Sequence, residues 1–421
     1  MTLAATTDIL VVGGGPAGAA AAYWAASAGH DVTVLEREAM PRDRPCGDTL
    51  TPRAVGELHD MGLRDQIADA HRIAGLRMTA HGRSVEVPWP QDSGRPDHGL
   101  TIRRPVLDEL LLRHAEAAGA VVWMGAEVTE PIIDEGHLRG CLAIGSGVEH
   151  APAGPLEVRA RFVVIADGPL SPFGRALGTA RSRTYAQGRA VRAYFRCEHH
   201  EDPWIESVFD LREGSGEQLP GYGWVFPMGD GTANVGVGLL SHHAGNEAIR
   251  PEDLFEQWVR QIPARWELDA TDLLGEPAGG RLPMGASVRP RSGPNWVVVG
   301  DAAGSVSPFN GDGVEPALSN GRLAAAVLGD ALQKGDGLEL RRYEAELDAR
   351  YDRYYRLGRL ATRALGQPGL MRRITRLGIR SRRLSEMTMR VSSNLVREDG
   401  TGAGSRVARI AERVAGLIPE E

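Results

Sequence analysis

The sequence predicts an α/β fold, with an α+β organisation overall, and three short glycine-containing segments carry this prediction. The segments are residues 13–18, 167–168 and 300–304, and each directly follows a run of apolar residues. A short apolar run that ends at a glycine turn is typical of a buried strand in a sheet covered on both faces. We therefore expect three strands of one sheet, separated in sequence by other elements, whose turns converge on one place.

The first segment lies inside a predicted βαβ unit. The pattern predicts a strand, an alanine-rich helix and a second strand over residues 9–12, 16–28 and 32–35. This order is typical of a Rossmann-type fold, in which the chain returns to a parallel strand through a helix.

The glycines of this unit predict a dinucleotide site. Gly13 permits the tight turn, Gly15 lets backbone N–H groups approach a pyrophosphate, and Gly18 lets the helix pack closely on the strand. Glu36 follows the second strand, where a ribose diol needs an acceptor. A glycine-rich turn without a ligand is the alternative, and this unit alone does not distinguish NAD from FAD.

The third segment favours FAD. Residues 300–304 end a strand, and the glycine-containing residues 308–313 lead into an apolar helix over residues 314–332. Asp301 at the strand end can hold a ribityl hydroxyl, while the positive N-terminus of the helix can approach the flavin O2 and N1 atoms. An NAD enzyme has no use for such a segment. Asp301 can alternatively serve only as a helix N-cap.

These motifs together carry a family resemblance. The first and third segments, and the pair Asp167-Gly168 with Ser171 and Arg175 downstream, resemble the para-hydroxybenzoate hydroxylase-type FAD superfamily. Two further stretches, RPCGD at residues 44–48 and PGYGWVFP at residues 220–227, are similar to the geranylgeranyl reductase family. Within that family, the runs at residues 46–58 and 219–238 most resemble the actinobacterial menaquinone reductases.

The chain departs from the pattern of that subgroup at a few positions. Thr49 replaces a small, glycine-like residue. Asp312, Val314 and Pro316 stand where the subgroup tends to carry Glu, Ile and an aromatic residue. Because Pro316 is expected beside the flavin, an FAD-dependent monooxygenase of a specialised-metabolite pathway stays open as an alternative.

The resemblance implies a set of FAD-binding residues. Arg103, after a predicted strand and before a predicted helix, resembles the flavin-pyrophosphate arginine of the family, and its neighbour Arg104 is expected to be solvated. The full set that the resemblance implies is Gly13, Gly15, Pro16, Ala17, Gly18, Glu36, Arg37, Arg44, Cys46, Gly47, Arg103, Val128, Asp167, Gly168, Asp301, Pro308, Gly311, Gly313 and Val314.

Three residues are the candidate catalytic group. Tyr222 and Trp224 alternate along a predicted strand, so both point to one face and can wall an apolar slot, although such pairs are also common in protein cores. The resemblance places Cys46 near the flavin as a proton donor or gate, and a buried inert thiol is the alternative.

The expected reaction is reduction of a prenyl lipid. Saturating an isolated C=C bond needs a hydride from reduced flavin N5 at one carbon and a proton at the other. A menaquinone side chain or a geranylgeranyl group is the expected substrate, with NAD(P)H or another reductant as electron donor.

Halogenation is disfavoured because the chain has a single lysine, Lys334, on a predicted surface helix. A non-catalytic flavin protein would not need the aromatic wall.

Composition and charge limit the remaining possibilities. The 421-residue chain is 42% hydrophobic and carries a net charge of −7, without an apolar stretch long enough to span a membrane or a secretory signal. We therefore expect a cytoplasmic protein. Three scattered cysteines predict neither a disulfide framework nor a metal site.

The C-terminal region is basic. Residues 341–421 carry 18 arginines and 10 acidic residues, and residues 370–396 interleave arginine with apolar side chains. Such a segment can lie peripherally on the anionic inner face of a membrane, or it can pack its apolar stripe onto the enzyme. The segment lacks the aromatic interleaving or the motif that would support nucleic-acid binding.

The signatures and the predicted strands divide the chain into three parts. An interrupted FAD-binding domain is expected over residues 1–74, 100–180 and 281–340. An antiparallel substrate-binding domain is expected over residues 75–99 and 181–280, followed by a helical basic region over residues 341–421.

Overall fold

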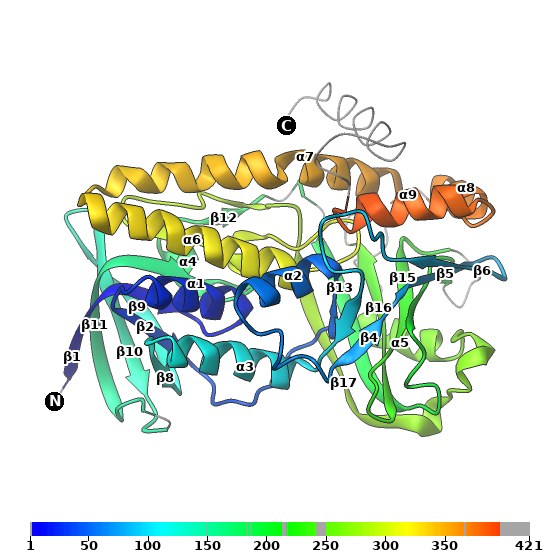
Figure 1. The fold of residues 1–421 in the computed structure, drawn as a ribbon, viewed down its shortest axis with the longest axis horizontal. Helices are drawn as coiled ribbons and strands as arrows, with labels where there is room; N and C mark the ends of the chain where they lie inside the picture. Colours follow the sequence, from blue (N-terminus) through cyan, green and yellow to red (C-terminus); the bar gives the residue numbers. More distant parts are fainter. Residues whose placement is uncertain are drawn as a thin grey trace.

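The computed structural model describes residues 2–148, 150–182, 184–185, 187–212, 216, 218–240, 250–365 and 368–395. Within these residues the chain builds two large sheets, which lie toward opposite ends of an elongated molecule (Figure 1). The last part of the predicted basic region, from residue 396 onward, lies outside the described residues.

The first sheet contains the predicted βαβ unit. Strands β1 (Leu3–Val12), β2 (Val32–Glu36), β8 (Val121–Met124), β11 (Gly154–Ile165) and β19 (Trp296–Val298) run parallel. The hairpin of β9 (Ala126–Asp134) and β10 (His137–Gly145) adds an antiparallel edge beside β11. Strands β1, β11 and β19 precede the three glycine segments, and because they are parallel neighbours the three turns meet at one edge of the sheet.

Helices α1 (Pro16–Ser27) and α6 (Val314–Lys334) pack in close backbone contact. A methyl group added at Gly18 would lie 1.9 Å from the carbonyl oxygen of Gly13, and one added at Gly321 would lie 2.4 Å from that of Ala17. Side chains larger than hydrogen therefore do not fit at these two positions. Helices α2 (Pro52–Asp60) and α3 (Arg104–Ala117) complete this layer.

The second sheet carries the predicted aromatic strand. Its order is β17-β13-β16-β15-β14-β5-β6. The strands are β5 (Gly75–Ala80), β6 (Arg83–Pro88), β13 (Gln187–Arg196), β14 (Trp204–Val208), β15 (Gly221–Pro227), β16 (Thr232–Leu240) and β17 (Leu273–Pro283). All neighbours are antiparallel except β14 and β5.

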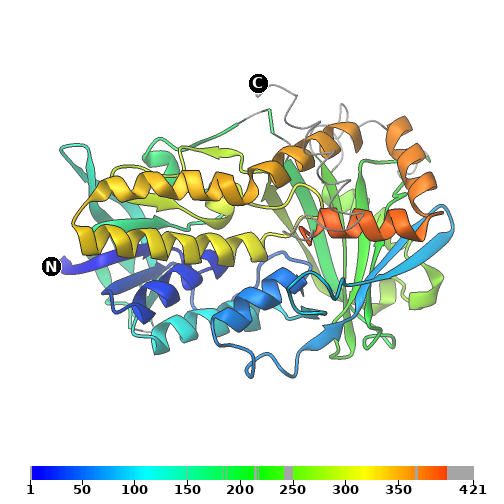
Figure 2. The same cartoon turned by 45° about the horizontal axis from the view of Figure 1, so that its top comes forward.

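The two faces of this sheet have different covers. Val225 packs beneath α5 (Pro251–Val259) in a core that includes Trp258. Trp224 alternates with Val225 and therefore faces the other side, where it shares a cluster with Ile379 and Met389. The C-terminal helices α8 (Pro368–Gly378) and α9 (Arg382–Ser392) lie over that side of the sheet (Figure 2).

Short elements link these layers. They are the small sheet β3 (Thr49–Leu50), β7 (Gly99–Thr101) and β4 (His71–Ile73), the pair β12 (Ala180–Arg181) and β18 (Val288–Arg289), and helix α4 (Pro172–Ala176). The long helix α7 (Arg341–Leu365) runs beside α6 and leads into α8 (Figures 1 and 2). Among the described helices, none combines the length and the apolar character that crossing a bilayer requires.

Candidate active site

A cavity of about 920 Å³ extends from the turns of the first sheet to the aromatic face of the second. Most of the residues in the predicted FAD-binding set line it, together with Tyr222 and Trp224. The lining members of the set are Gly13, Gly15, Pro16, Ala17, Glu36, Arg37, Arg44, Cys46, Gly47, Val128, Asp167, Gly168, Asp301, Pro308, Gly311, Gly313 and Val314. Gly18 and Arg103 are the two members that do not line it.

The β1–α1 turn requires its glycine. Gly13 has a φ of +102°, and a methyl group added there would lie 2.3 Å from the carbonyl oxygen of Ala166. Gly15 has no such conflict, but it leaves the N-terminus of α1 open toward the cavity. An open helix N-terminus with its backbone N–H groups suits a phosphate group.

Glu36 lies at the end of β2 with its side chain buried. Its Oε2 accepts a hydrogen bond from the Gly14 amide at 2.8 Å, and its Oε1 accepts one from the Glu38 amide at 3.0 Å. The carboxylate thereby fixes the turn and also lines the cavity. Both features agree with the predicted acceptor role, although the turn already uses part of the carboxylate.

The expectation that Arg104 is solvated is wrong. Its guanidinium donates two hydrogen bonds of 2.7 Å to the buried Asp108 and lines the cavity. Arg103 instead points away, pairs with Asp230 at 2.9 Å and stacks over the ring of Tyr194. Because helix α3 begins at Arg104, the N-cap geometry of Arg103 sends the two neighbouring side chains in different directions. We therefore transfer the proposed flavin contact to Arg104.

Arg42 is a cavity residue that the sequence analysis missed. It is 8% exposed and lies 3.5 Å from Glu36 and 3.1 Å from Asp108. Its Nη1 atom faces Asp108, whereas its buried Nε atom has no hydrogen-bond partner among the described residues. A buried N–H group that lacks an acceptor favours an anionic ligand at this end of the cavity. Arg42 belongs to a run of surface-like arginines in the sequence, so no pattern separates it from them.

The two strand-end aspartates differ in their surroundings. Asp167 accepts hydrogen bonds from Ser171 Oγ at 2.6 Å and from the Phe173 amide at 2.9 Å, so it holds the start of α4. No described residue donates a hydrogen bond to the side chain of Asp301, and burial raises the pKa of this carboxyl to about 6. A half-buried acceptor that faces the cavity fits a ligand hydroxyl, as the sequence predicts for the ribityl chain.

The loop before α6 is held by Asp312. Its carboxylate accepts hydrogen bonds from the amides of Val314 and Glu315, and from Thr51 Oγ1 at 2.9 Å. Burial, together with repulsion by Glu315, raises the pKa of Asp312 to about 6. The capping leaves the glycines of the loop and the N-terminus of α6 free to face the cavity.

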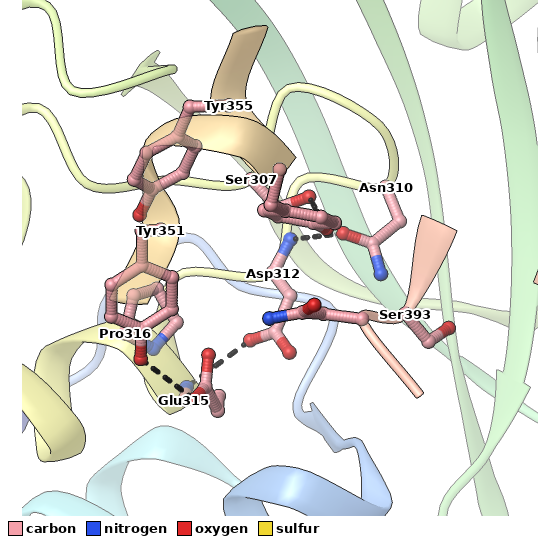
Figure 3. Close-up of a pocket in the computed structure, with 10 residues that line it drawn as sticks. Ser307, Asn310, Asp312, Glu315, Pro316, Tyr351, Tyr355 and Ser393 are labelled. Atoms are coloured by element: carbon pink, nitrogen blue, oxygen red, sulfur yellow. Dashed lines mark hydrogen bonds between the residues drawn. The ribbon is translucent and has the colours of Figure 1, made fainter. Parts of the chain in front are cut away.

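A second, small pocket lies beside this loop (Figure 3). Glu315 and Tyr351 point toward each other in it, and the Tyr351 hydroxyl donates to Glu315 at 2.9 Å. Pro316 lines this pocket and is absent from the lining of the large cavity. The small pocket shares Asn310 and Asp312 with the large cavity, so the expected place of Pro316 beside the flavin stays a prediction.

Cys46 is held by a hydrogen-bonded network. The Asn234 amide nitrogen donates to the Cys46 carbonyl and to Asp48 Oδ2, both at 2.8 Å, while its oxygen accepts from Trp224 Nε1 at 3.0 Å. Asp48, with a φ of +59°, also accepts from the Tyr194 hydroxyl at 2.5 Å. The network fixes the Pro-Cys-Gly turn against the aromatic strand, and neither Asn234 nor Asp48 was a predicted site residue.

The aromatic side chains of β15 form one continuous wall. The ring centroids of Tyr222 and Trp224 are 5.8 Å apart, and those of Trp224 and Phe226 are 5.9 Å apart. The Tyr222 hydroxyl donates to the carbonyl of Asn310 at 2.8 Å, which joins the wall to the loop before α6. All three residues line the cavity, so the predicted slot is present.

Known proteins resemble the chain over most of its length. A family model described as FAD binding domain matches residues 6–356. A menaquinone reductase of Mycobacterium tuberculosis is 39% identical over 99% of this chain and 98% of that protein. A digeranylgeranylglycerophospholipid reductase of Methanoculleus marisnigri is 31% identical over 78% of each chain.

A crystal structure also shares the fold. The geranylgeranyl bacteriochlorophyll reductase-like protein of Thermoplasma acidophilum superposes with a TM-score of 0.75 at 22% identity, over 99% of this chain and 100% of that one. The prediction of an α/β flavoprotein fold and the predicted family resemblance are confirmed.

The arrangement of the two arginines yields a test of the cofactor contacts. We expect Arg104→Ala to weaken FAD binding by about 2 kcal/mol, roughly 30-fold, because it removes a charged donor from the cavity. Arg103→Ala is the matched control and should bind FAD like the unaltered protein. Titration of the apoproteins with FAD measures both affinities, and circular dichroism checks the fold. Equal losses in the two variants would contradict the assignment.

The raised pKa of Cys46 yields a pH prediction. Burial raises the pKa of this thiol to about 11, so the reactive thiolate is scarce in the folded protein at neutral pH. We expect alkylation by iodoacetamide to be slow near pH 7 and to rise roughly tenfold per pH unit toward the pKa. Cys46→Ala gives the background from the two other cysteines. Rapid labelling of Cys46 at pH 7 would show that the thiol is already ionised.

Proposed function

We propose that this chain, which belongs to the FAD binding domain family and is an FAD-dependent oxidoreductase, saturates an isoprenoid C=C bond of a prenyl lipid. A menaquinone side chain or a geranylgeranyl group is the proposed substrate. The observation that carries the proposal is the single cavity, in which the predicted flavin residues and the aromatic wall of β15 face the same space. The relatives that reduce such lipids support it.

The apolar part of the cavity suits a hydrocarbon chain. Its walls combine Tyr222, Trp224 and Phe226 with aliphatic side chains from the second sheet and from the C-terminal helices. A polyprenyl chain offers no hydrogen bonds, so the protein must hold it by shape and by exclusion of water. The aliphatic lining residues include Leu76, Met78, Ile205, Leu239, Leu282, Met371, Ile374 and Ile379.

The protein's own part in the chemistry is to position the substrate and supply a proton. Reduced FAD, when bound, supplies the hydride for one carbon of the double bond, and the other carbon takes a proton. Cys46, Tyr222 and Asp312 are titratable groups that line the cavity. Burial raises the pKa of Cys46 to about 11 and that of Tyr222 to about 12, so both keep their protons at neutral pH. We propose Cys46, held by the Asn234 network, as the donor or gate.

We also propose that the protein acts from the cytoplasm at the surface of an anionic membrane. The arginines of α8 and of the segment that follows it support this proposal, because Arg372, Arg373, Arg376, Arg380 and Arg383 are exposed and lie more than 4 Å from any carboxylate of the described residues. Clustered cations near an anionic lipid surface strengthen binding additively.

The reaction is tested by the mass of its product. Chemically reduced enzyme, mixed anaerobically with a polyprenyl quinone or a geranylgeranyl lipid, should reoxidise its flavin and add two hydrogens to the substrate. We expect Trp224→Ala to slow this step on the order of 100-fold, because the chain is held less closely. Trp224→Phe keeps the wall while losing the hydrogen bond to Asn234, and it should be affected less.

A different product would select the alternative. A substrate that gains one oxygen, and only in air, would establish an FAD-dependent monooxygenase. Unchanged prenyl substrate, with flavin that stays reduced in the absence of air, would overturn prenyl reduction.

Membrane attachment has its own test. The protein should co-sediment with vesicles that contain phosphatidylglycerol, and binding should fall as salt screens the arginines. The triple change Arg372→Glu, Arg373→Glu and Arg376→Glu should weaken binding at least tenfold. The matched control reverses three exposed arginines on other parts of the chain, Arg64, and Arg159 and Arg161 on β11. Equal recovery from the supernatant at every salt concentration would refute attachment.

A further inference from the structure

We infer that the large cavity opens at α8 onto the membrane-facing side of the protein, so that the prenyl chain passes directly from the bilayer into the site. This inference rests on the proposed function and adds the route by which the substrate arrives. Three features of α8 support it: one face lines the cavity, the adjacent face is apolar and exposed, and arginines flank that exposed face.

Helix α8 is part of the cavity wall. Met371, Ile374, Thr375 and Gly378 line the cavity, and they recur at the spacing of one helical face. Helix α9 contributes Ser385 and Thr388 beside them. The apolar end of the cavity therefore lies directly beneath these two short helices rather than in the interior of a sheet.

The adjacent face of α8 is apolar and exposed. Leu370 is 38% exposed, Ile374 44% and Leu377 63%. Their spacing of four and three residues places them in one stripe along the helix. Ile374 belongs to both the stripe and the cavity lining. Leu384, at the start of the neighbouring helix α9, is also 36% exposed. An exposed stripe that continues into an apolar cavity is costly in water and favourable in lipid.

The charge around this stripe selects an anionic bilayer as its partner. Arg372, Arg373 and Arg376 alternate with the stripe along α8, and all three are exposed. An amphipathic helix of this composition lies in the lipid interface, with its apolar residues below the headgroups and its arginines at the phosphates. In that position Ile374 would face the acyl chains, and the prenyl chain would enter without crossing water.

Helix α8 is anchored to the second sheet by one side-chain hydrogen bond of the described residues. Thr375 Oγ1 lies 3.0 Å from His81 Nε2 and also donates to the Met371 carbonyl. Met371 and Ile379 are buried on either side of this contact. The opening is thus bordered by a helix whose inner face is fixed while its outer stripe stays free for lipid.

The experiment compares two substrates that reach the cavity by different routes. One is long-chain menaquinone held in phosphatidylglycerol vesicles, and the other is a quinone with a single short prenyl group that dissolves in water. We expect Leu377→Asp to slow turnover of the vesicle-bound substrate at least tenfold, even at saturating vesicle concentration. Turnover of the soluble substrate should change less than twofold, because Leu377 does not line the cavity. Leu370→Asp is a second variant of the same kind, and Leu338→Asp, on a 59% exposed leucine elsewhere, is the control.

A second measurement does not depend on catalysis. Vesicles of brominated phosphatidylglycerol should quench the added tryptophan of Leu377→Trp and leave that of Leu338→Trp unquenched, both measured against the unaltered protein. Absence of quenching at Leu377, or full turnover of the vesicle-bound substrate by Leu377→Asp, would overturn the route. If the protein self-associates and binds no vesicles, the apolar stripe contacts a second copy of the chain, and the proposed route from the bilayer is likewise overturned. Failure of the unaltered enzyme to reduce the soluble substrate would instead overturn the proposed function.

Discussion

The side-chain amide of Asn234 is the interaction on which the geometry of the site depends. It is fully buried, and it joins Trp224 of the aromatic wall to Cys46 and Asp48 of the long loop that follows the βαβ unit. All donors and acceptors of this amide except one lone pair are used, so a change there leaves buried polar groups unpaired. The Pro-Cys-Gly turn and the aromatic wall of β15 are thereby held together by a neutral residue, and the Tyr194 hydroxyl adds a second bond to Asp48.

Much of this organisation was predictable from local sequence. Gly18 and Glu36 act through contacts within one βαβ unit, and the positions of strands, turns and the aromatic wall follow from periodicity and glycine spacing. What the sequence did not reveal depends on partners distant in the chain. Asn234 is 188 residues from Cys46, and its strand pattern marks it only as one alternating position.

The two neighbouring arginines show a different limit. Arg103 and Arg104 are adjacent and chemically identical, and the start of α3 falls between them: Arg103 is the N-cap residue, and Arg104, the first helical residue, lines the cavity. A boundary error of one residue in a predicted helix is enough to exchange their roles.

The basic segment shows a third limit, because its apolar residues lie on more than one face. Met371 and Ile379 are buried, as expected for a segment that packs its apolar side chains onto the enzyme. Leu370 and Leu377 are exposed, as expected for a segment that lies on a membrane.

The apolar cover of the cavity bears on the choice between reduction and oxygenation. Flavin enzymes of one fold support both chemistries, so the difference must lie in how the site treats water, protons and the substrate. Here Trp224 packs with Ile379 and Met389, so the C-terminal helices close the substrate side with hydrocarbon. Two titratable groups of the cavity, Cys46 and Tyr222, have a pKa raised by burial, which keeps them neutral. The apolar wall accommodates an isoprenoid chain, and the neutral Cys46 and Tyr222 leave protonation to a few fixed positions. Helices α8 and α9 can cover the cavity and also border the proposed entrance for the prenyl chain. Both are possible because α8 has apolar residues on its cavity face and on its exposed face.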